Sequence, residues 1–311
     1  SVKLWENLSQ ELNYNMMFSQ RGVMNLAHNE HDIKEMKRRI SANRLNGLDT
    51  QWLETKEIKR LVPIMNTDNL RYPVLGAAYQ PRGGVARHDA IAWGFAMRAD
   101  EMGVDIIQNC EVHSIKTKNG KVEGVKTSKG FINAKKIAVV ASGHTSVLAK
   151  TAGVRLPLQS RPLQALVSEP IKPVINTVVM SNAVHAYVSQ SDKGELVIGG
   201  APDSAQSFRR DIKQHVFEDT VGAMLELFPS FKKLKLLRQW GGHLDITPDA
   251  SPIMDETSVP GLYVTAGWWG GYKAIPAGGL TMAHQVATNS PHPLMETFSH
   301  NRFKNLDYIL A

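Results

Sequence analysis

The stretch that decides the fold is Gly261-Leu262-Tyr263-Val264-Thr265-Ala266-Gly267-Trp268-Trp269-Gly270-Gly271-Tyr272-Lys273. It predicts a short apolar strand and a glycine-rich turn, followed by a helix from about Pro276 to Asn289. This order places backbone N–H groups at a helix N-terminus, where a phosphate or an electron-rich ring edge is held. Glycine also lets the backbone approach a flat ligand closely. An ordinary tight turn between a strand and a helix explains the same residues, so both interpretations stay open.

A second apolar run, from Lys136 to Ala141, ends in Ser142-Gly143 and is typical of a buried parallel strand. Before it, the alternating residues 104–110 predict a strand, and Asn119-Gly120 predicts a hairpin between residues 112–117 and 121–126. The segments at about 15–80 and 157–240 have sequence patterns typical of antiparallel strands joined by turns. We therefore expect an α/β part interleaved with an α+β part.

Composition excludes several classes of protein. The 311 residues carry a net charge of +7, 42% hydrophobic residues and one cysteine, Cys110, which excludes disorder, a disulfide scaffold and a cysteine-based metal cluster. The sequence has no membrane-length apolar run and no opening signal segment, so we expect a soluble protein in a reducing compartment. Its basic residues form short groups rather than a stripe with aromatics, which argues against nucleic acid and leaves an anion-binding or partner surface.

The turn from Gly83 to Asp89 delivers Arg87 and His88 to the start of a helix predicted over about 89–99, with Asp89 as its cap. A surface or capping role is the common one for such a histidine. A histidine beside an arginine at a helix N-terminus also suits an anionic ligand or a tethered cofactor. The other histidines lack metal-ligand spacing, so no metal site is expected.

One expected motif is missing. Neither Gly-x-Gly-x-x-Gly nor a phosphate-binding Walker loop occurs near the start, and the chain opens at Ser1 inside an amphipathic pattern without a methionine. We therefore expect a fragment that lacks the first βαβ unit of a dinucleotide-binding fold.

Five long strings resemble one family over essentially the whole chain. They lie at residues 12–28, 82–96, 103–112, 162–174 and 237–253, and include Ala-Arg-His-Asp at 86–89 and Thr-Pro-Asp-Ala-Ser-Pro-Ile at 247–253. The sequence resembles the β-subunit family of heterotetrameric sarcosine oxidases, within the D-amino-acid-oxidase-like flavoproteins. The resemblance implies a glutathione-reductase-like FAD domain, incomplete at its N-terminus, and an antiparallel-sheet substrate domain. The expected FAD-binding segments are residues 1–14, 81–156 and 241–311, and the expected substrate or catalytic segments are 15–80 and 157–240.

The implied activity is oxidative demethylation of sarcosine to glycine. The resemblance implies that electrons pass through non-covalent FAD to covalent FMN, where oxygen is reduced to hydrogen peroxide. It also implies a cytoplasmic hetero-oligomer with alpha, gamma and delta subunits, acting on a small secondary amine acid and binding neither nucleic acid nor membrane.

The resemblance also implies roles for individual residues. His88 matches the histidine that tethers FMN, Arg87 is a phosphate or flavin partner, and Lys273 is the catalytic lysine near the flavin and the substrate carboxylate. Val112 matches a backbone contact to adenine, and Gly143 matches a strand end beside the cofactor. The loop that lies against FAD corresponds to Gly267, Gly270, Gly271, Tyr272 and Lys273.

The chain departs from the family pattern in two places. Relatives usually have Gly-Trp-Gly-Thr-Gly-Gly-Phe-Lys at the turn, whereas this chain is one residue shorter and carries the bulky Trp269. Monomeric relatives have an oxygen-activating lysine on a central strand, and Glu195 to Gly200 has none, which agrees with oxygen reacting at a second flavin. The alternatives are a related amine or imino-acid dehydrogenase subunit, of the proline or dimethylglycine type, and an inactive fragment that acts only in subunit interaction.

Overall fold

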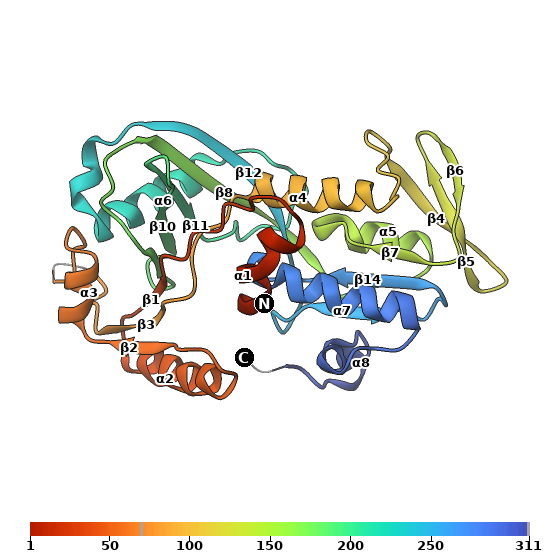
Figure 1. Ribbon diagram of the computed structural model, residues 1–311, viewed down its shortest axis with the longest axis horizontal. Coiled ribbons are helices and arrows are strands. Elements are labelled where there is room, and N and C mark those ends of the chain that lie inside the picture. The colour runs from red at the N-terminus through yellow and green to blue at the C-terminus, as the bar shows by residue number, and fades with distance from the viewer. Residues whose placement is uncertain (69–70, 310–311) are drawn as a thin grey trace.

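A computed structural model describes residues 1–68 and 71–309, so the last two residues of the segment expected at 241–311 lie outside the described residues. The chain combines one large sheet with two three-stranded sheets and several helices (Figure 1). The expected mixture of an α/β part and an α+β part is confirmed. In the described part of the chain, no helix is long and apolar enough to cross a membrane.

The large sheet has eight strands in the order β12-β8-β11-β10-β9-β1-β3-β2. All neighbouring pairs are antiparallel except β1 and β9, which run parallel. Two strands joined by a hairpin must run antiparallel. β1 and β9 are free to run parallel, because much of the chain lies between them. The strands are β1 (Val23–Ala27), β2 (Gln51–Leu53), β3 (Gly76–Gln80), β8 (Gln159–Pro170), β9 (Val178–Ser181), β10 (Ala186–Gln190), β11 (Glu195–Gly200) and β12 (Leu236–Ile246).

Helices cover both faces of this sheet. On one face, α3 (Thr55–Leu61) and α6 (Gln214–Leu227) bury Ile58 and Leu227 against strand residues such as Ile198. On the other face, α2 (Glu30–Leu45) packs Met36 and Ile40 against the β1 and β3 end. The burial of these apolar side chains is the main force that holds the layers together.

One row of paired residues, the transverse row, runs across the strands of the large sheet, on the face that α2 covers only in part. Trp240, Ala165, Gly199 and Tyr187 are direct neighbours across β12, β8, β11 and β10. The row continues through Met180, Asn25, Ala78 and Trp52. Small residues therefore separate two aromatic rings at the end of the sheet that α2 does not cover.

The second sheet, in the order β13-β14-β7, contains β7 (Ile137–Val139), β13 (Ile253–Glu256) and β14 (Leu262–Ala266). Strands are present at both predicted apolar runs, and β7 is parallel as expected: it pairs with β14. After β7 come the short helix η1 (Ser142–His144) and α5 (Thr145–Thr151); after β14 come η3 (Gly271–Ala274) and α7 (Ile275–Thr288). The remaining helices are α1 (Val2–Glu11), α4 (His88–Glu101), η2 (Pro229–Lys233), η4 (Pro293–Phe298) and α8 (Arg302–Asn305).

The third sheet, β4-β5-β6, extends at one end of the molecule (Figure 1). The predicted hairpin is confirmed, because Asn119 and Gly120 both have positive φ between β4 and β5. The strands are β4 (Val112–Lys118), β5 (Lys121–Thr127) and β6 (Gly130–Asn133).

Two local predictions are wrong. Residues 104–110 form no strand, because no described segment pairs with them, and Val104 and Ile107 are about half exposed. Asp89 is not a helix cap: α4 begins at His88 and Arg87 is its N-cap. In α3, Glu54 is the N-cap, and a reciprocal capping box joins it to Glu57.

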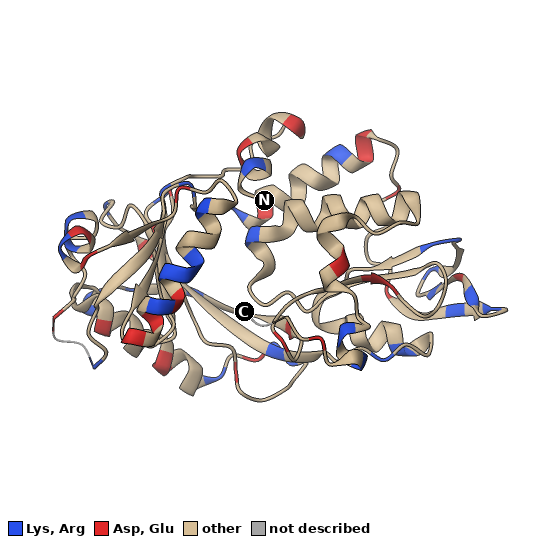
Figure 2. Cartoon of the chain, turned by 90° about the horizontal axis from the view of Figure 1, so that it is seen from below, with Lys and Arg blue, Asp and Glu red and all other residues tan. Residues whose placement is uncertain are grey.

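Charged residues are distributed without a single basic stripe. Figure 2 shows lysines and arginines interspersed with acidic residues over most of the chain. Many of the ion pairs that bring opposite charges together lie at the surface, for example Arg38 with Glu35 and Lys59 with Asp68. The positive surplus is therefore spread over the molecule.

Candidate functional site

Two turns meet where the parallel strands β7 and β14 end. The turn after β7 carries Gly143 in η1, and the turn after β14 begins at Gly267. Both glycines are buried. Ligands of sheets with parallel strands bind beyond the carboxyl ends of those strands, so this edge is the candidate cofactor site.

The packing of the second turn itself requires glycine at two positions. Gly267 has φ +77°, and a Cβ there would lie 2.4 Å from Thr247 Cγ2. A Cβ on Gly271 would lie 2.4 Å from Trp268 Cβ. Gly270 differs: it has φ +60°, and the nearest atom to a Cβ there is Lys273 Nζ at 3.6 Å. Of these three glycines, Gly270 therefore leaves its backbone open to a ligand.

Other groups of the protein already bind two of the N–H groups in this turn. The Gly267 N–H donates to Asp245 Oδ2 at 2.6 Å, and the Gly271 N–H donates to the Trp268 carbonyl at 3.1 Å. These two glycines therefore offer close approach to a ligand rather than free hydrogen-bond donors.

Lys273 is the cation of this turn. Its Nζ donates to the Gly270 carbonyl at 2.7 Å, and no carboxylate lies within ion-pair distance among the described residues. Its side chain is accessible to solvent but surrounded by protein, and this burial, with the nearby charge of Arg39, lowers the pKa of the ammonium group. Arg39 belongs to α2, which packs against the β1 and β3 end of the large sheet.

The turn is attached to two segments far away in the sequence. The Trp5 indole N–H donates to the Lys273 carbonyl at 2.9 Å, and the Trp5 and Tyr272 rings are 5.9 Å apart. The Tyr272 hydroxyl donates to the Ala86 carbonyl at 3.3 Å. Burial and the nearby Asp89 carboxylate raise the pKa of Tyr272. The structure thus brings the turn close to the segment that carries His88.

His88 is the first residue of α4 and its side chain is exposed. The neighbouring Arg87 pairs with Asp89, with Nε 3.1 Å from Oδ1, and this hydrogen bond lowers the pKa of the Asp89 carboxyl. Arg87 therefore already has an anionic partner, whereas the His88 imidazole is accessible to a ligand from outside.

Val112 lies apart from these residues. It opens β4 in the third sheet, and none of the described hydrogen bonds or ring contacts joins its side chain to the turns. Among the described residues there is also no group of three or more histidine, cysteine, aspartate or glutamate side chains placed to hold a metal ion.

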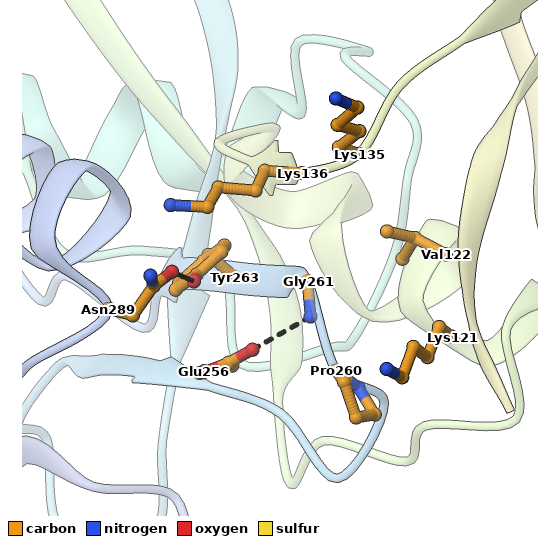
Figure 3. Close-up of a pocket in the computed structure, with 9 residues that line it drawn as sticks. All are labelled: Lys121, Val122, Lys135, Lys136, Glu256, Pro260, Gly261, Tyr263 and Asn289. Atoms are coloured by element: carbon orange, nitrogen blue, oxygen red, sulfur yellow. Dashed lines mark hydrogen bonds between the residues drawn. The ribbon is translucent and has the colours of Figure 1, made fainter.

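A pocket of about 400 Å³ lies at the opposite edge of the second sheet (Figure 3). Gly261, just before β14, lines it, and its N–H donates to Glu256 at 2.7 Å. Lys136, just before β7, donates to the carbonyl of Val286. This pocket lies at the amino ends of β7 and β14, so it is separate from the turns.

Sequence patterns did not identify Trp5, Arg39 and Asp245 as parts of the site. Trp5 reaches Lys273 across 268 positions of sequence, and Asp245 reaches Gly267 across 22. Trp5 and Arg39 stand in no glycine turn and no matched string. Asp245 lies within the matched string at residues 237–253, but no role was assigned to it there, so only tertiary structure relates it to the turn.

Comparison with known proteins gives a consistent result. Residues 1–285 match the model of the DAO family, described as FAD dependent oxidoreductases. The chain is 52% identical over 306 residues to the sarcosine oxidase subunit beta of an Arthrobacter species, covering 98% of this chain and 76% of the relative. It is also 52% identical over 307 residues to the subunit of that name from Rhodobacter capsulatus, covering 98% and 74%.

Among solved structures, L-proline dehydrogenase from P. horikoshii superposes with a TM-score of 0.91 at 26% identity, covering 99% of this chain and 82% of that one. Sequence and structure thus indicate the same group of proteins. The chain belongs to the DAO family of FAD-dependent oxidoreductases.

Proposed function

We propose that this chain acts as the beta subunit of a two-flavin sarcosine oxidase. The observation that carries the proposal is the identity with sarcosine oxidase beta subunits along nearly the whole chain. The reaction removes two electrons and a proton from sarcosine, and water then releases glycine and formaldehyde from the oxidised product. The assembled enzyme would also contain alpha, gamma and delta subunits.

Lys273 would bind the substrate carboxylate. Its ammonium group has one hydrogen-bond acceptor, the Gly270 carbonyl, and no carboxylate partner among the described residues. A substrate carboxylate would provide the missing negative charge through a charge-assisted hydrogen bond. This contact would orient the secondary amine for reaction.

The residues at the turns fit FAD. Gly270 leaves room for close backbone approach, and Lys273 supplies positive charge at the same place. We assign Gly143, Gly267, Gly270, Gly271, Tyr272 and Lys273 to the flavin side of the site, and Val112 to the adenine side. When bound, FAD would accept the electrons of the amine, and FMN would be the place where oxygen is reduced to hydrogen peroxide.

His88 would hold FMN covalently. The fit rests on its accessible imidazole at the beginning of α4 and on its closeness in sequence to Ala86, which Tyr272 contacts. Arg87 would contact the FMN only by exchanging its pairing with Asp89 for a flavin phosphate.

We further propose that residues 1–14, 81–156 and 241–311 form the FAD-binding domain and residues 15–80 and 157–240 the substrate domain. β7 and β14 belong to the first group, and β1, β3 and β8 to β11 belong to the second. β12 continues across the boundary and, with β8, connects the two domains.

Covalent flavin tests the assignment of FMN. When the assembled enzyme is denatured, the beta subunit should keep a flavin fluorescence band. His88→Ala should lose this band, and His113→Ala, a control at an exposed histidine, should keep it. Persistence of the band in His88→Ala would refute the role of His88.

The structural similarity to L-proline dehydrogenase favours a second candidate, an imino-acid dehydrogenase. Anaerobic addition of sarcosine, dimethylglycine or proline separates the two, because only the true substrate bleaches the FAD absorbance quickly. Oxygen uptake with sarcosine supports the oxidase. Bleaching by proline without oxygen uptake would support the dehydrogenase.

A further inference from the structure

One buried carboxylate contacts both turns of the candidate site. Asp245, on β12, is 3% exposed. Its Oδ2 accepts the Gly267 N–H at 2.6 Å, at the start of the turn after β14. Its Oδ1 accepts the Ser142 hydroxyl at 3.5 Å, in the turn after β7.

The residue that pairs with Asp245 across the sheet also binds one of the two turns. Ser160 on β8 is its direct register partner, and the Ser160 hydroxyl donates to the Gly143 carbonyl at 2.6 Å. A Cβ on Gly143 would lie 3.1 Å from both Ser160 Oγ and His243 Cβ, so the turn rests directly on the two strands. The ends of β8 and β12 therefore hold both turns from the large sheet.

The turn after β7 needs such support. Ser142 has φ +47°, and a non-glycine residue in the left-handed region persists only where its surroundings fix it. A buried carboxylate also needs hydrogen-bond donors, and the Gly267 N–H supplies one. The contact is thus favourable for both groups.

We propose that Asp245 is a positioning residue that sets the distance between the large sheet and the turn carrying Lys273. The inference rests on the proposed role of Lys273 in binding the substrate carboxylate. The proposed role of Asp245 involves no contact with substrate or flavin, because both of its hydrogen-bond partners belong to the turns. It fixes Gly267, and through Gly267 the path of the chain to Lys273, and the same carboxylate also contacts the Ser142 hydroxyl in the turn that carries Gly143.

The experiment compares Asp245→Ala and Asp245→Asn in the assembled enzyme with its flavins. Asparagine keeps an oxygen that accepts the Gly267 N–H, and alanine does not. Asp105→Ala is the matched control, since Asp105 is exposed and its side chain has no partner among the described residues. Hydrogen exchange at the Gly267 amide, the KM for sarcosine, kcat and FAD content are measured for each.

In Asp245→Ala we expect hydrogen exchange at the Gly267 amide to become about tenfold faster or more. The KM for sarcosine should rise by a similar factor, because this is the effect of losing one hydrogen bond to a charged group. FAD content and kcat should change less. Asp245→Asn should stay within about threefold of the unchanged enzyme, because its side chain keeps the acceptor. Asp105→Ala should change none of these.

Unchanged amide exchange or unchanged KM in Asp245→Ala would overturn the inference, and so would equal losses in the alanine and asparagine variants. If Asp245→Ala does not fold, Ser160→Ala replaces it. In that variant amide exchange should rise at residues 142–144, while the Gly267 amide stays protected. Faster exchange at Gly267 with no change at residues 142–144 counts against the proposal. If sarcosine fails to reduce the unchanged enzyme, the proposed function fails, and the exchange data still decide whether Asp245 positions the turn.

Discussion

At the scale of single residues, Lys273 combines two opposing properties. Its ammonium group is crowded by protein and lies near the positive charge of Arg39, and both effects lower its pKa. It is nevertheless the group proposed to bind an anion. Binding a carboxylate would relieve the unfavourable charge, so substrate affinity and protonation of Lys273 are linked.

The linkage predicts a pH dependence of substrate binding. Because the pKa of Lys273 is lowered from 10.5, the KM for sarcosine should rise at a pH below 10.5, as the ammonium group loses its proton. Lys273→Arg should abolish this rise, since arginine stays protonated. Lys273→Met should raise KM by about 10- to 100-fold near pH 7, because a charge-assisted hydrogen bond is lost, and by less at higher pH, where the lysine itself loses its charge. KM measured from about pH 7 to 10 checks this, and identical profiles for lysine and arginine would contradict it.

At the scale of secondary structure elements, the transverse row of the large sheet constrains β11. A Cβ on Gly199 would lie 2.1 Å from the ring of Tyr187 on the neighbouring strand β10. The ring therefore lies over the glycine, and burial of the ring raises the pKa of the Tyr187 phenol. Close packing of this kind leaves no space for even one methyl group.

Two glycine-to-alanine changes should have opposite effects. Gly199→Ala should lower the free energy of unfolding by about 1–3 kcal/mol, because the added methyl group displaces Tyr187. Gly222→Ala should raise it by about 0.5–1 kcal/mol, because Gly222 lies inside α6 with nothing within 4 Å of its Cβ position. Urea unfolding curves of the two variants give both values. Equal stability of Gly199→Ala and the unchanged protein would show that the row tolerates a larger residue.

Short sequence patterns predicted those strands and turns that depend on residues close together in the sequence. The apolar runs before Gly143 and Gly267 gave β7 and β14, and Asn119-Gly120 gave a hairpin. Residues 104–110 misled the prediction, because alternation shows that a segment can pair but not that a partner strand is present. The cap of α4 was also misassigned, because Asp89 binds Arg87 instead of beginning the helix.

The candidate site was predictable only in part. The glycine turn and His88 stand in recognisable strings, and the family resemblance supplied their roles. Trp5 and Asp245 became visible only in three dimensions, because hydrogen bonds between segments distant in sequence leave no local pattern.

At the scale of the whole molecule, a buried ion pair attaches the C-terminal segment to the body of the protein. Arg302, at the start of α8, donates to both oxygens of Asp249 at 2.7 and 3.0 Å. Burial opposes ionisation of Asp249, but hydrogen bonds from Arg302 and from the backbone outweigh it and lower the pKa from 3.8 to about 2. The pair therefore stabilises the fold only while Asp249 is ionised.

This pair predicts part of the acid unfolding. A lowered carboxyl pKa stabilises the protein above its unfolded value of 3.8, and the contribution is lost as pH falls from about 3.8 to about 2. Its size is about 2 kcal/mol. Arg302→Met should cost about 3–5 kcal/mol at neutral pH, because it leaves a buried carboxylate without its positive partner. Adding Asp249→Asn should recover part of this loss, and urea midpoints near neutral and acid pH check both expectations. A double variant no more stable than Arg302→Met would contradict the account.

The position of β1 in the large sheet has a consequence for how the chain is made. β1 lies between β3 and β9, and roughly 150 residues separate Ala27 from the first residue of β9. A ribosome adding 5–20 residues per second needs about 8–30 s to supply that neighbour. During this delay the edge of β1 that β9 later covers stays unpaired on the nascent chain. The yield of native protein should therefore depend on chaperones that occupy this edge until β9 leaves the ribosome.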